Sequence, residues 1–300
     1  MRNFIFGTDW GADSDDAVAA RLLARAAAAG QIRLLGAGIN CVREHSYASL
    51  CAYFEHEGVS VPVGLDTREL GFDWRETYQP RLAAHRPELN NRMADTAVRV
   101  YRRALATCEG KAEIAEVGFL QVLADLLLSP ADDLSPLTGY ELVRDKVAHV
   151  WIMGGKWDED GEREFNLSAH PTAAWAAATV VEKCPAPITF LGFEIGDGVV
   201  TGDRLPEGDW LKQALTDHGS GAGRYSWDPM LAALALAGDP ARAGYRTVEG
   251  YAVIDPATGA NHFTPAAGGP HRYVIKTQED RFYTEVINRA IEPKQQGVNL

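Results

Sequence analysis

The first forty residues alternate between short apolar runs and one alanine-rich stretch, and this order strongly limits the fold. Residues 4–6 are apolar, residues 15–29 are rich in Ala, Leu and Arg and precede Gly30, and residues 32–39 are apolar again. A short apolar run bounded by polar residues is typical of a strand buried on both faces, whereas Asp at the start and Gly after the end mark a helix. The pattern predicts a βαβ unit.

The same alternation continues beyond residue 230. We expect further helices at residues 44–56, 95–108 and 172–183 and from Trp227, and further strands at residues 61–65, 148–153 and 188–193. This order predicts an α/β fold with a mostly parallel open sheet and helices on both faces. Glycine-rich alternating segments at 250–255 and 272–276, followed by a helix at 279–291, predict a small C-terminal hairpin and a closing helix within a single domain, residues 1–300.

Residues 66–91 contain several aromatic side chains among charged and turn-forming residues. Such a segment is typical of a long loop over the mouth of an active site, and a pair of short surface helices is equally compatible with it.

The balance of charge excludes some classes of partner. The chain has 29 Lys and Arg against 41 Asp and Glu, a net charge of −12. Nucleic acids and anionic membrane surfaces would be repelled, and no run of about 18 apolar residues is present that could form a membrane span. The four cysteines lack the spacing of a metal site, so we expect reduced thiols. Because residues 1–6 already read as a strand, we expect no cleavable signal and a cytoplasmic location.

Four carboxylates follow the first predicted strand. Asp9, Asp13, Asp15 and Asp16 lie within eight residues, at the carboxyl edge of the sheet where open α/β folds bind ligands. Helix capping can account for Asp13 and Ser14, but like charges this close repel each other unless a cation lies between them. An all-oxygen set of donors favours calcium or magnesium.

These residues also carry a resemblance to a known family. The pattern Asp9-x-Gly11-x-Asp13-x-Asp15-Asp16-Ala17 resembles the N-terminal signature of the inosine-uridine nucleoside hydrolase family, in a variant with two extra residues before the paired aspartates. Further segments are similar to sequence blocks of that family in the same order: Gly38-Ile39-Asn40, residues 117–124, Met153-Gly154-Gly155, Glu164-Phe165-Asn166, His170-Pro171 and Trp227-Asp228-Pro229.

The resemblance implies an enzyme that hydrolyses the N-glycosidic bond of a ribonucleoside, releasing ribose and base, with Ca2+ as cofactor. It implies that Asp9 binds calcium and takes the proton of the attacking water. The other ligands it implies are Asp16, Asp228 and the main-chain carbonyl of Gln121. A nucleoside is the expected partner, and we expect a homo-oligomer, a dimer or a tetramer. The substrate-binding residues that it implies are Asp15, Asn40, Glu164, Asn166 and Trp227.

One departure from the family concerns the leaving base. Trp227 stands where purine-tolerant members have a histidine that protonates the base, and an indole cannot deliver a proton at neutral pH. The general acid is therefore missing or elsewhere. The candidates are Tyr225, Glu194, His85 and His271.

Several alternatives remain open. Asp13 is an added metal ligand, a residue behind the ligands or a helix cap, and Asp228 before Pro229 would also suit a helix cap. A non-catalytic relative that binds calcium and a nucleoside or sugar is the alternative function. A metal-dependent phosphatase is less compatible, because no Lys or Arg accompanies the aspartates in the sequence to receive a phosphate.

Overall fold

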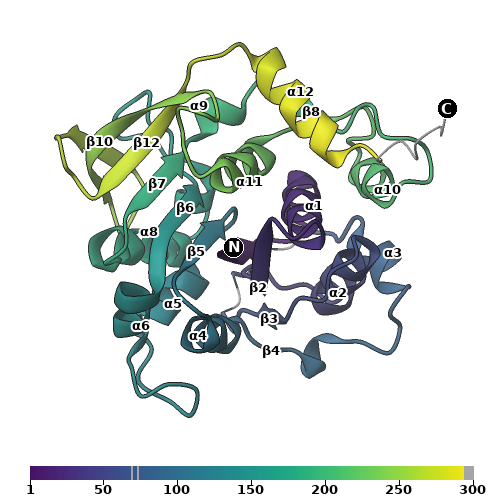
Figure 1. Ribbon diagram of the computed structural model, residues 1–300, viewed down its shortest axis with the longest axis horizontal. Helices are drawn as coiled ribbons and strands as arrows, with labels where there is room; N and C mark the ends of the chain where they lie inside the picture. The colour runs from purple at the N-terminus through teal and green to yellow at the C-terminus, as the bar shows by residue number, and fades with distance from the viewer. Residues whose placement is uncertain (69, 73, 294–300) are drawn as a thin grey trace.

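A ten-stranded sheet runs through the molecule, and helices cover both of its faces (Figure 1). The computed structural model describes residues 1–68, 70–72 and 74–293. The strands of this sheet, in spatial order, are β11 (Asn261–Pro265), β10 (Tyr245–Ile254), β12 (His271–Lys276), β7 (Ile188–Leu191), β6 (Val147–Met153), β5 (Ala112–Glu116), β1 (Arg2–Thr8), β2 (Ile32–Ile39), β3 (Val63–Leu65) and β4 (Asp95–Thr96). The predicted α/β fold with a mostly parallel open sheet is confirmed.

In this spatial order, each neighbouring pair of strands from β12 across to β4 is parallel. β10 is antiparallel to both of its neighbours, β11 and β12. Two further strands form a separate antiparallel ribbon, β8 (Val200–Thr201) with β9 (Arg224–Tyr225). The helices are α1 (Asp15–Ala28), α2 (Ser46–His56), α3 (Gln79–Ala83), α4 (Ala97–Thr107), α5 (Gln121–Leu128), α6 (Gly139–Lys146), α7 (Phe165–Ser168), α8 (Pro171–Lys183), α9 (Phe193–Gly196), α10 (Trp210–Asp217), α11 (Trp227–Ala237) and α12 (Asp280–Ile291), with a short 3-10 helix at Asn91–Met93.

Alternate side chains of β1 enter two separate cores. Phe4 and Phe6 are fully buried on the face covered by α1, α2 and α11, while Ile5 is fully buried on the face covered by α4, α5 and α8. This is the pattern expected of a central parallel strand, which is apolar on both faces. The core therefore holds β1 rigidly and fixes the position of the residues that follow it.

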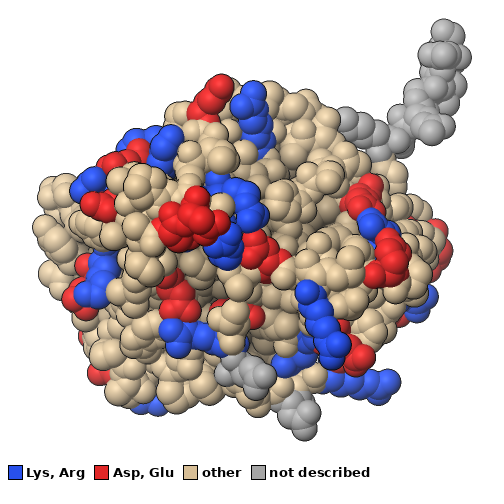
Figure 2. Space-filling model, turned by 90° about the horizontal axis from the view of Figure 1, so that it is seen from below, with Lys and Arg blue, Asp and Glu red and all other residues tan. Residues whose placement is uncertain are grey.

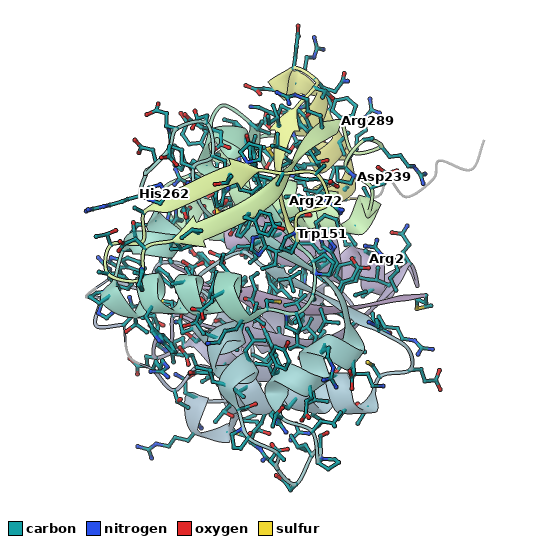
Figure 3. The ribbon with its side chains drawn as sticks, turned by 90° about the vertical axis from the view of Figure 1, so that its left-hand side faces the viewer. Arg2, Trp151, Asp239, His262, Arg272 and Arg289 are labelled. Atoms are coloured by element: carbon teal, nitrogen blue, oxygen red, sulfur yellow. The ribbon has the colours of Figure 1, made fainter. Side chains whose placement is uncertain are left out.

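The C-terminal strands extend the main sheet. β12 pairs in parallel with β7, so the predicted hairpin, which also includes β11, becomes the sheet's last three strands. Figure 3 shows Arg272 of β12, Trp151 of β6 and Arg2 of β1, which line a cavity of about 480 Å³ at the amino ends of the strands. The predicted closing helix is α12, which packs against α1 and α11.

The described residues between 66 and 91 form mainly irregular structure around the short helix α3. Tyr78 in this segment is fully buried, and its hydroxyl donates a hydrogen bond to the main-chain oxygen of Asp13 at 3.0 Å. The segment therefore lies against the aspartate cluster, as the loop interpretation predicts, and it also contains one short helix.

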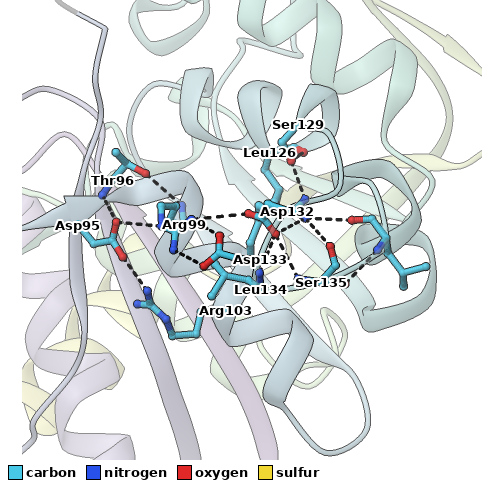
Figure 4. A network of polar contacts seen from close by, with 12 residues as sticks. Asp95, Thr96, Arg99, Arg103, Leu126, Ser129, Asp132, Asp133, Leu134 and Ser135 are labelled. Atoms are coloured by element: carbon cyan, nitrogen blue, oxygen red, sulfur yellow. Dashed lines mark hydrogen bonds and ion pairs between the residues drawn. The ribbon is translucent and has the colours of Figure 1, made fainter.

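Arginines of α4 hold the connection between α5 and α6 (Figure 4). Arg102 is 1% exposed, and its guanidinium donates to both carboxylate oxygens of Asp132 at 2.8 Å, to Ser129 Oγ at 2.8 Å and to the Leu137 oxygen at 2.9 Å. Arg99 forms a second pair with Asp133 at 2.7 Å.

The surface carries both signs of charge close together. On the face shown in Figure 2, Lys and Arg side chains lie among Asp and Glu side chains, and neither sign forms a continuous patch. None of the helices in the described ranges is long and apolar enough to span a bilayer. All four cysteines are free thiols.

Candidate active site

The aspartate cluster lies at the carboxyl end of β1, in the turn that leads into α1. β1 ends at Thr8, and the turn closes where the Ala12 N–H donates to the Asp9 oxygen at 2.9 Å. Gly11 has a φ of +92°, a conformation that side-chain-bearing residues rarely adopt, and a Cβ there would collide with Gln79. This glycine therefore lets the chain turn sharply while Asp9 stays at the sheet edge.

Three of the predicted metal ligands meet at this edge. Asp9, Asp16 and Asp228 are buried, and they offer carboxylate oxygens that lie within 4.8 Å of one another. Asp16 Oδ1 accepts a hydrogen bond from the Thr8 hydroxyl, and Asp16 Oδ2 is buried without a hydrogen-bond partner among the described residues. Because a buried carboxylate oxygen without a partner is costly, this arrangement suits a ligand that supplies positive charge.

Burial and mutual repulsion both raise the pKa values of these carboxyl groups. Burial raises the pKa of Asp9 to about 7, and the neighbouring carboxylates of Asp15 and Asp13 add to the rise. Burial and the nearby carboxylates likewise raise the pKa values of Asp16 and Asp228 well above the ordinary range. A divalent cation among them would offset the repulsion and favour the ionised forms, so the donor set fits a hard metal ion.

Asp228 belongs to the carboxylate group and does not cap its helix. It lies in the first turn of α11, whose N-cap is Ser226. The Asp228 N–H donates instead to Asp15 Oδ2 at 3.1 Å, which joins the start of α11 to the start of α1. The capping alternative for Asp228 is therefore wrong, and its carboxylate is available to a ligand.

A cavity of about 300 Å³ opens onto the carboxylates. Its walls combine an acidic end with apolar and aromatic side chains from several elements, and Trp74 of the predicted loop is one of them. The lining residues are Asp9, Ala12, Asp13, Asp15, Asp16, Trp74, Val117, Met153, Glu164, Phe165, Asn166, Phe193, Arg224, Trp227 and Asp228. The size and the mixed lining are typical of a small-molecule site.

Glu164 and Asn166 line this cavity from the turn that begins α7. Glu164 Oε1 accepts from the Asn166 N–H at 2.9 Å, and Oε2 accepts from the Gly155 N–H at 3.0 Å. The Asn166 amide donates to the Val117 oxygen at 2.9 Å. Burial raises the pKa of Glu164 to about 7. These bonds fix both side chains at the cavity wall.

Asn40 and Gln121 lie behind the cavity lining. Asn40 is fully buried, its Oδ1 accepts from the Phe119 N–H at 3.2 Å, and its main-chain oxygen accepts from the Gln121 side chain. A Cβ at Gly118 would lie 2.6 Å from Asp9 Oδ1 and 2.8 Å from Asn40 Oδ1, so glycine is required for this close approach. Asn40 therefore lies near Asp9, across Gly118, although it is not one of the residues that line the cavity.

The candidate general acids do not line the cavity. His85 packs against Trp210 in a tilted arrangement, with ring centroids 4.1 Å apart, and His271 Nδ1 accepts from the Ala252 N–H at 3.0 Å. Glu194 accepts from the Trp157 N–H at 3.2 Å, and Tyr225 is 41% exposed.

Trp227 does line the cavity, but its indole N–H is already used. The N–H donates to the Phe193 oxygen at 2.8 Å, and the Trp227 ring stacks on Phe193 with centroids 5.2 Å apart. Neither Trp227 nor the candidate acids thus places a proton donor at the cavity wall.

Asp13 forms an ion pair with Arg224, a residue that the sequence did not predict at this site. Arg224 Nε donates to Asp13 Oδ1 at 2.8 Å, and Nη2 donates to Asp13 Oδ2. Asp13 does not join the three-carboxylate group, and the N-cap of α1 is Ser14, so Asp13 lies at the cavity wall as neither a member of that group nor the helix cap. The prediction that no basic side chain accompanies the aspartates is wrong, because Arg224 lies 211 residues away in the sequence and only the fold brings it to Asp13.

Comparison with known proteins identifies the fold. No family model matches the sequence, and no curated protein matches it. Among solved structures, the inosine-uridine preferring nucleoside hydrolase of Bacillus anthracis superposes with a TM-score of 0.70 at 18% identity, covering 97% of this chain and 99% of that chain.

Two other solved structures are similar over nearly the same length. The purine-preferring ribonucleoside hydrolase of Gardnerella vaginalis has a TM-score of 0.65 at 16% identity, covering 97% of this chain and 98% of that chain. The type III effector protein XopQ, solved with adenosine diphosphate ribose, has a TM-score of 0.62 at 17% identity, covering 97% and 93%. The chain therefore has the fold of the nucleoside hydrolases.

Proposed function

We propose that the protein is a calcium-dependent nucleoside hydrolase that cleaves the N-glycosidic bond of a ribonucleoside to ribose and base. The observation that carries this proposal is the meeting of three buried carboxylates at one end of a cavity walled by aromatic side chains. The shared fold with nucleoside hydrolases supports it.

Asp9, Asp16 and Asp228 are the proposed side-chain ligands of the metal, and the main-chain oxygen of Gln121 is the proposed fourth. Carboxylate and carbonyl oxygens are the ligands that Ca2+ prefers. The bound ion would supply positive charge that orients ribose hydroxyls and makes a nearby water easier to deprotonate.

Side chains of the protein carry out proton transfer and bind the substrate. Asp9 accepts the proton of the water whose oxygen attacks C1′, and the acidic end of the cavity stabilises the positive charge that develops on the sugar. Asp15 accepts a hydrogen bond from a ribose hydroxyl, and Asn40 lies nearby, next to Asp9. Glu164 and Asn166 hold the 5′ side of the sugar, and Trp227 forms a wall for the base.

The test is release of free ribose from a panel of ribonucleosides, measured with calcium and with a chelator. We expect chelation to abolish release and Asp9→Asn to reduce kcat at least about a hundredfold, the usual contribution of a general base. The matched control is Glu182→Gln on the exposed end of α8, which should retain wild-type kcat. Ribose release that is unaffected by both chelation and Asp9→Asn would refute the proposal.

A second candidate function is binding of a nucleoside or sugar without catalysis. The observation that favours it is that neither Trp227 nor the candidate acids places a proton donor at the cavity wall. Calcium-dependent binding of ribose without turnover of any riboside would select this alternative. The expected homo-oligomer and cytoplasmic location stay predictions.

A further inference from the structure

Arg224 is a cation inside the same cavity as the carboxylates. It lies on β9, lines the cavity, and its guanidinium carbon is 5.4 Å from the centre of the Trp227 ring. Among the described residues that line the cavity, it is the only Lys, Arg or His. The cavity therefore combines carboxylates suited to a metal and a sugar with a guanidinium that pairs with Asp13 and lies beside an aromatic ring.

The pair with Asp13 occupies only one edge of the guanidinium. Asp13 accepts from Nε and Nη2, which share one edge of the planar fork, and Nη1 has no hydrogen-bond partner among the described residues. An arginine has five N–H donors in a fixed geometry, so the edge that carries Nη1 remains available to an acceptor. Asp13 and Trp227 hold the orientation of this edge.

A leaving base that departs without a proton is stabilised by such a cation. When water oxygen bonds to C1′, the C1′–N bond breaks and its electron pair goes to the base nitrogen, while the water proton goes to Asp9. Neither Trp227 nor the candidate acids supply a proton at the cavity wall, and a base that receives no proton departs as an anion and takes its proton from solvent afterwards. A guanidinium cannot transfer a proton, but it stabilises a delocalised anion by charge and hydrogen bonds.

We propose that Arg224 binds the leaving base in its anionic form, and that the site therefore prefers N-ribosides whose base departs as a delocalised anion. The inference rests on the proposed hydrolase function. It makes Arg224 a catalytic residue, with Asp13 as the residue that positions it.

The first test compares leaving groups of graded basicity in wild type and Arg224→Met. Loss of the guanidinium should lower kcat on nucleosides about 10²- to 10³-fold, the usual effect of removing one donor to a developing anion. It should lower kcat much less on 4-nitrophenyl riboside, whose leaving group is already a stable anion. The dependence of rate on leaving-group basicity therefore becomes steeper in the variant.

The matched control is Arg81→Met, because Arg81 makes the same two-bond pair with Asp217 but is 53% exposed and lies outside the cavity lining. This control should keep the wild-type dependence on leaving-group basicity. A merely structural role for Arg224 would lower kcat equally for all leaving groups. An equal loss across the series, or no loss, overturns the proposal.

The second test needs no turnover and separates this inference from the hydrolase function. Calorimetry measures binding of urate, which is anionic at neutral pH, and of hypoxanthine, a neutral purine of similar shape. Wild type should bind urate at least tenfold more tightly than Arg224→Met does, with hypoxanthine affected little. If no riboside is hydrolysed but urate binding depends on Arg224, the hydrolase function fails and the anion site stands; urate binding equal in both proteins overturns the anion site.

Discussion

Asp13 and Arg224 show what a single residue's sequence context can and cannot reveal. Asp13 is one of four clustered carboxylates in the sequence, which suggests a metal ligand or a helix cap, yet in the fold it binds a guanidinium. Asp9, Asp15, Asp16 and Asp228 could be named as candidates from their motifs because the family resemblance covers those segments, and the structure brings all four to one cavity. Arg224 was not, because no local pattern marks a residue on a two-residue strand that meets its partner only in the folded chain.

Glu116 is a second residue with an unusual environment. It is fully buried in β5, its Oε1 accepts from the Tyr101 hydroxyl at 3.0 Å, and Oε2 has no hydrogen-bond partner among the described residues. A Cβ at Gly7 would collide with this carboxyl, so a glycine in β1 makes room for it. Burial raises the pKa of Glu116 to about 8.

This raised pKa makes the stability of the protein depend on pH. Because the unfolded chain releases the Glu116 proton near pH 4.5 and the folded chain near pH 8, the folded state holds one more proton between these values. Folding stability should therefore fall as pH rises from about 5 to 8, by a few kcal/mol at most. The Glu116→Gln variant keeps the shape of the side chain and still accepts the hydrogen bond from the Tyr101 hydroxyl. Because glutamine does not ionise, the variant lacks this contribution to the pH dependence of stability.

Urea unfolding at pH 5 and pH 8 measures the effect. We expect the stability difference between Glu116→Gln and wild type to grow in favour of the variant as pH rises. The control is Glu182→Gln, which changes an exposed carboxyl and should follow wild type at both pH values. An identical pH dependence in wild type and Glu116→Gln would contradict the raised pKa.

At the scale of elements, apolar runs were predictable and charged strands were not. The strand at residues 32–39 and the helix from residue 15 match β2 and α1 because their periodicity and end residues agree with the fold. β5 reads Ala-Glu-Ile-Ala-Glu, which looks too polar for a central strand. Its Glu113 is accommodated because it accepts from Arg2 at 2.6 Å and from the Trp151 indole at 2.8 Å.

Arg102 is the buried charge that fastens α4 to the connection between α5 and α6. It donates to Asp132, Ser129 and the Leu137 oxygen, so removing the guanidinium takes a buried hydrogen-bond donor away from all three. We expect Arg102→Met to destabilise the protein by roughly 2–4 kcal/mol. The control is Arg103→Met on the same helix, whose exposed pair with Asp95 should contribute under about 1 kcal/mol. Chemical unfolding measures both, and equal losses would contradict this account.

At the scale of the whole molecule, the pairing of distant segments could not be read from the sequence. The alternating, glycine-containing C-terminal segments predict a small hairpin but not its place in the sheet, and in the structure β12 aligns with β7 and continues the main sheet. The strand before Asp9 and the helix that contains Asp228 are likewise far apart in sequence, and only the packing of α1 against α11 joins the two parts of the candidate metal site.

Because the candidate metal site joins the start of α1 to the start of α11, metal binding should stabilise the whole fold. If Ca2+ binds only the folded chain, calcium at 100 times its Kd stabilises the protein by about 2.7 kcal/mol, which for 300 residues raises Tm by about 4 °C. If the whole chain is a single domain, as the sequence predicts, it should shift in one cooperative transition. Asp16→Asn removes a ligand and its repulsion of Asp9 and Asp228, so it should abolish the calcium-induced rise while Tm in chelator stays equal to wild type or higher. Circular dichroism in the far and near ultraviolet measures these transitions with and without calcium. A calcium-induced rise that persists in Asp16→Asn would show that the ion binds somewhere other than between the starts of α1 and α11.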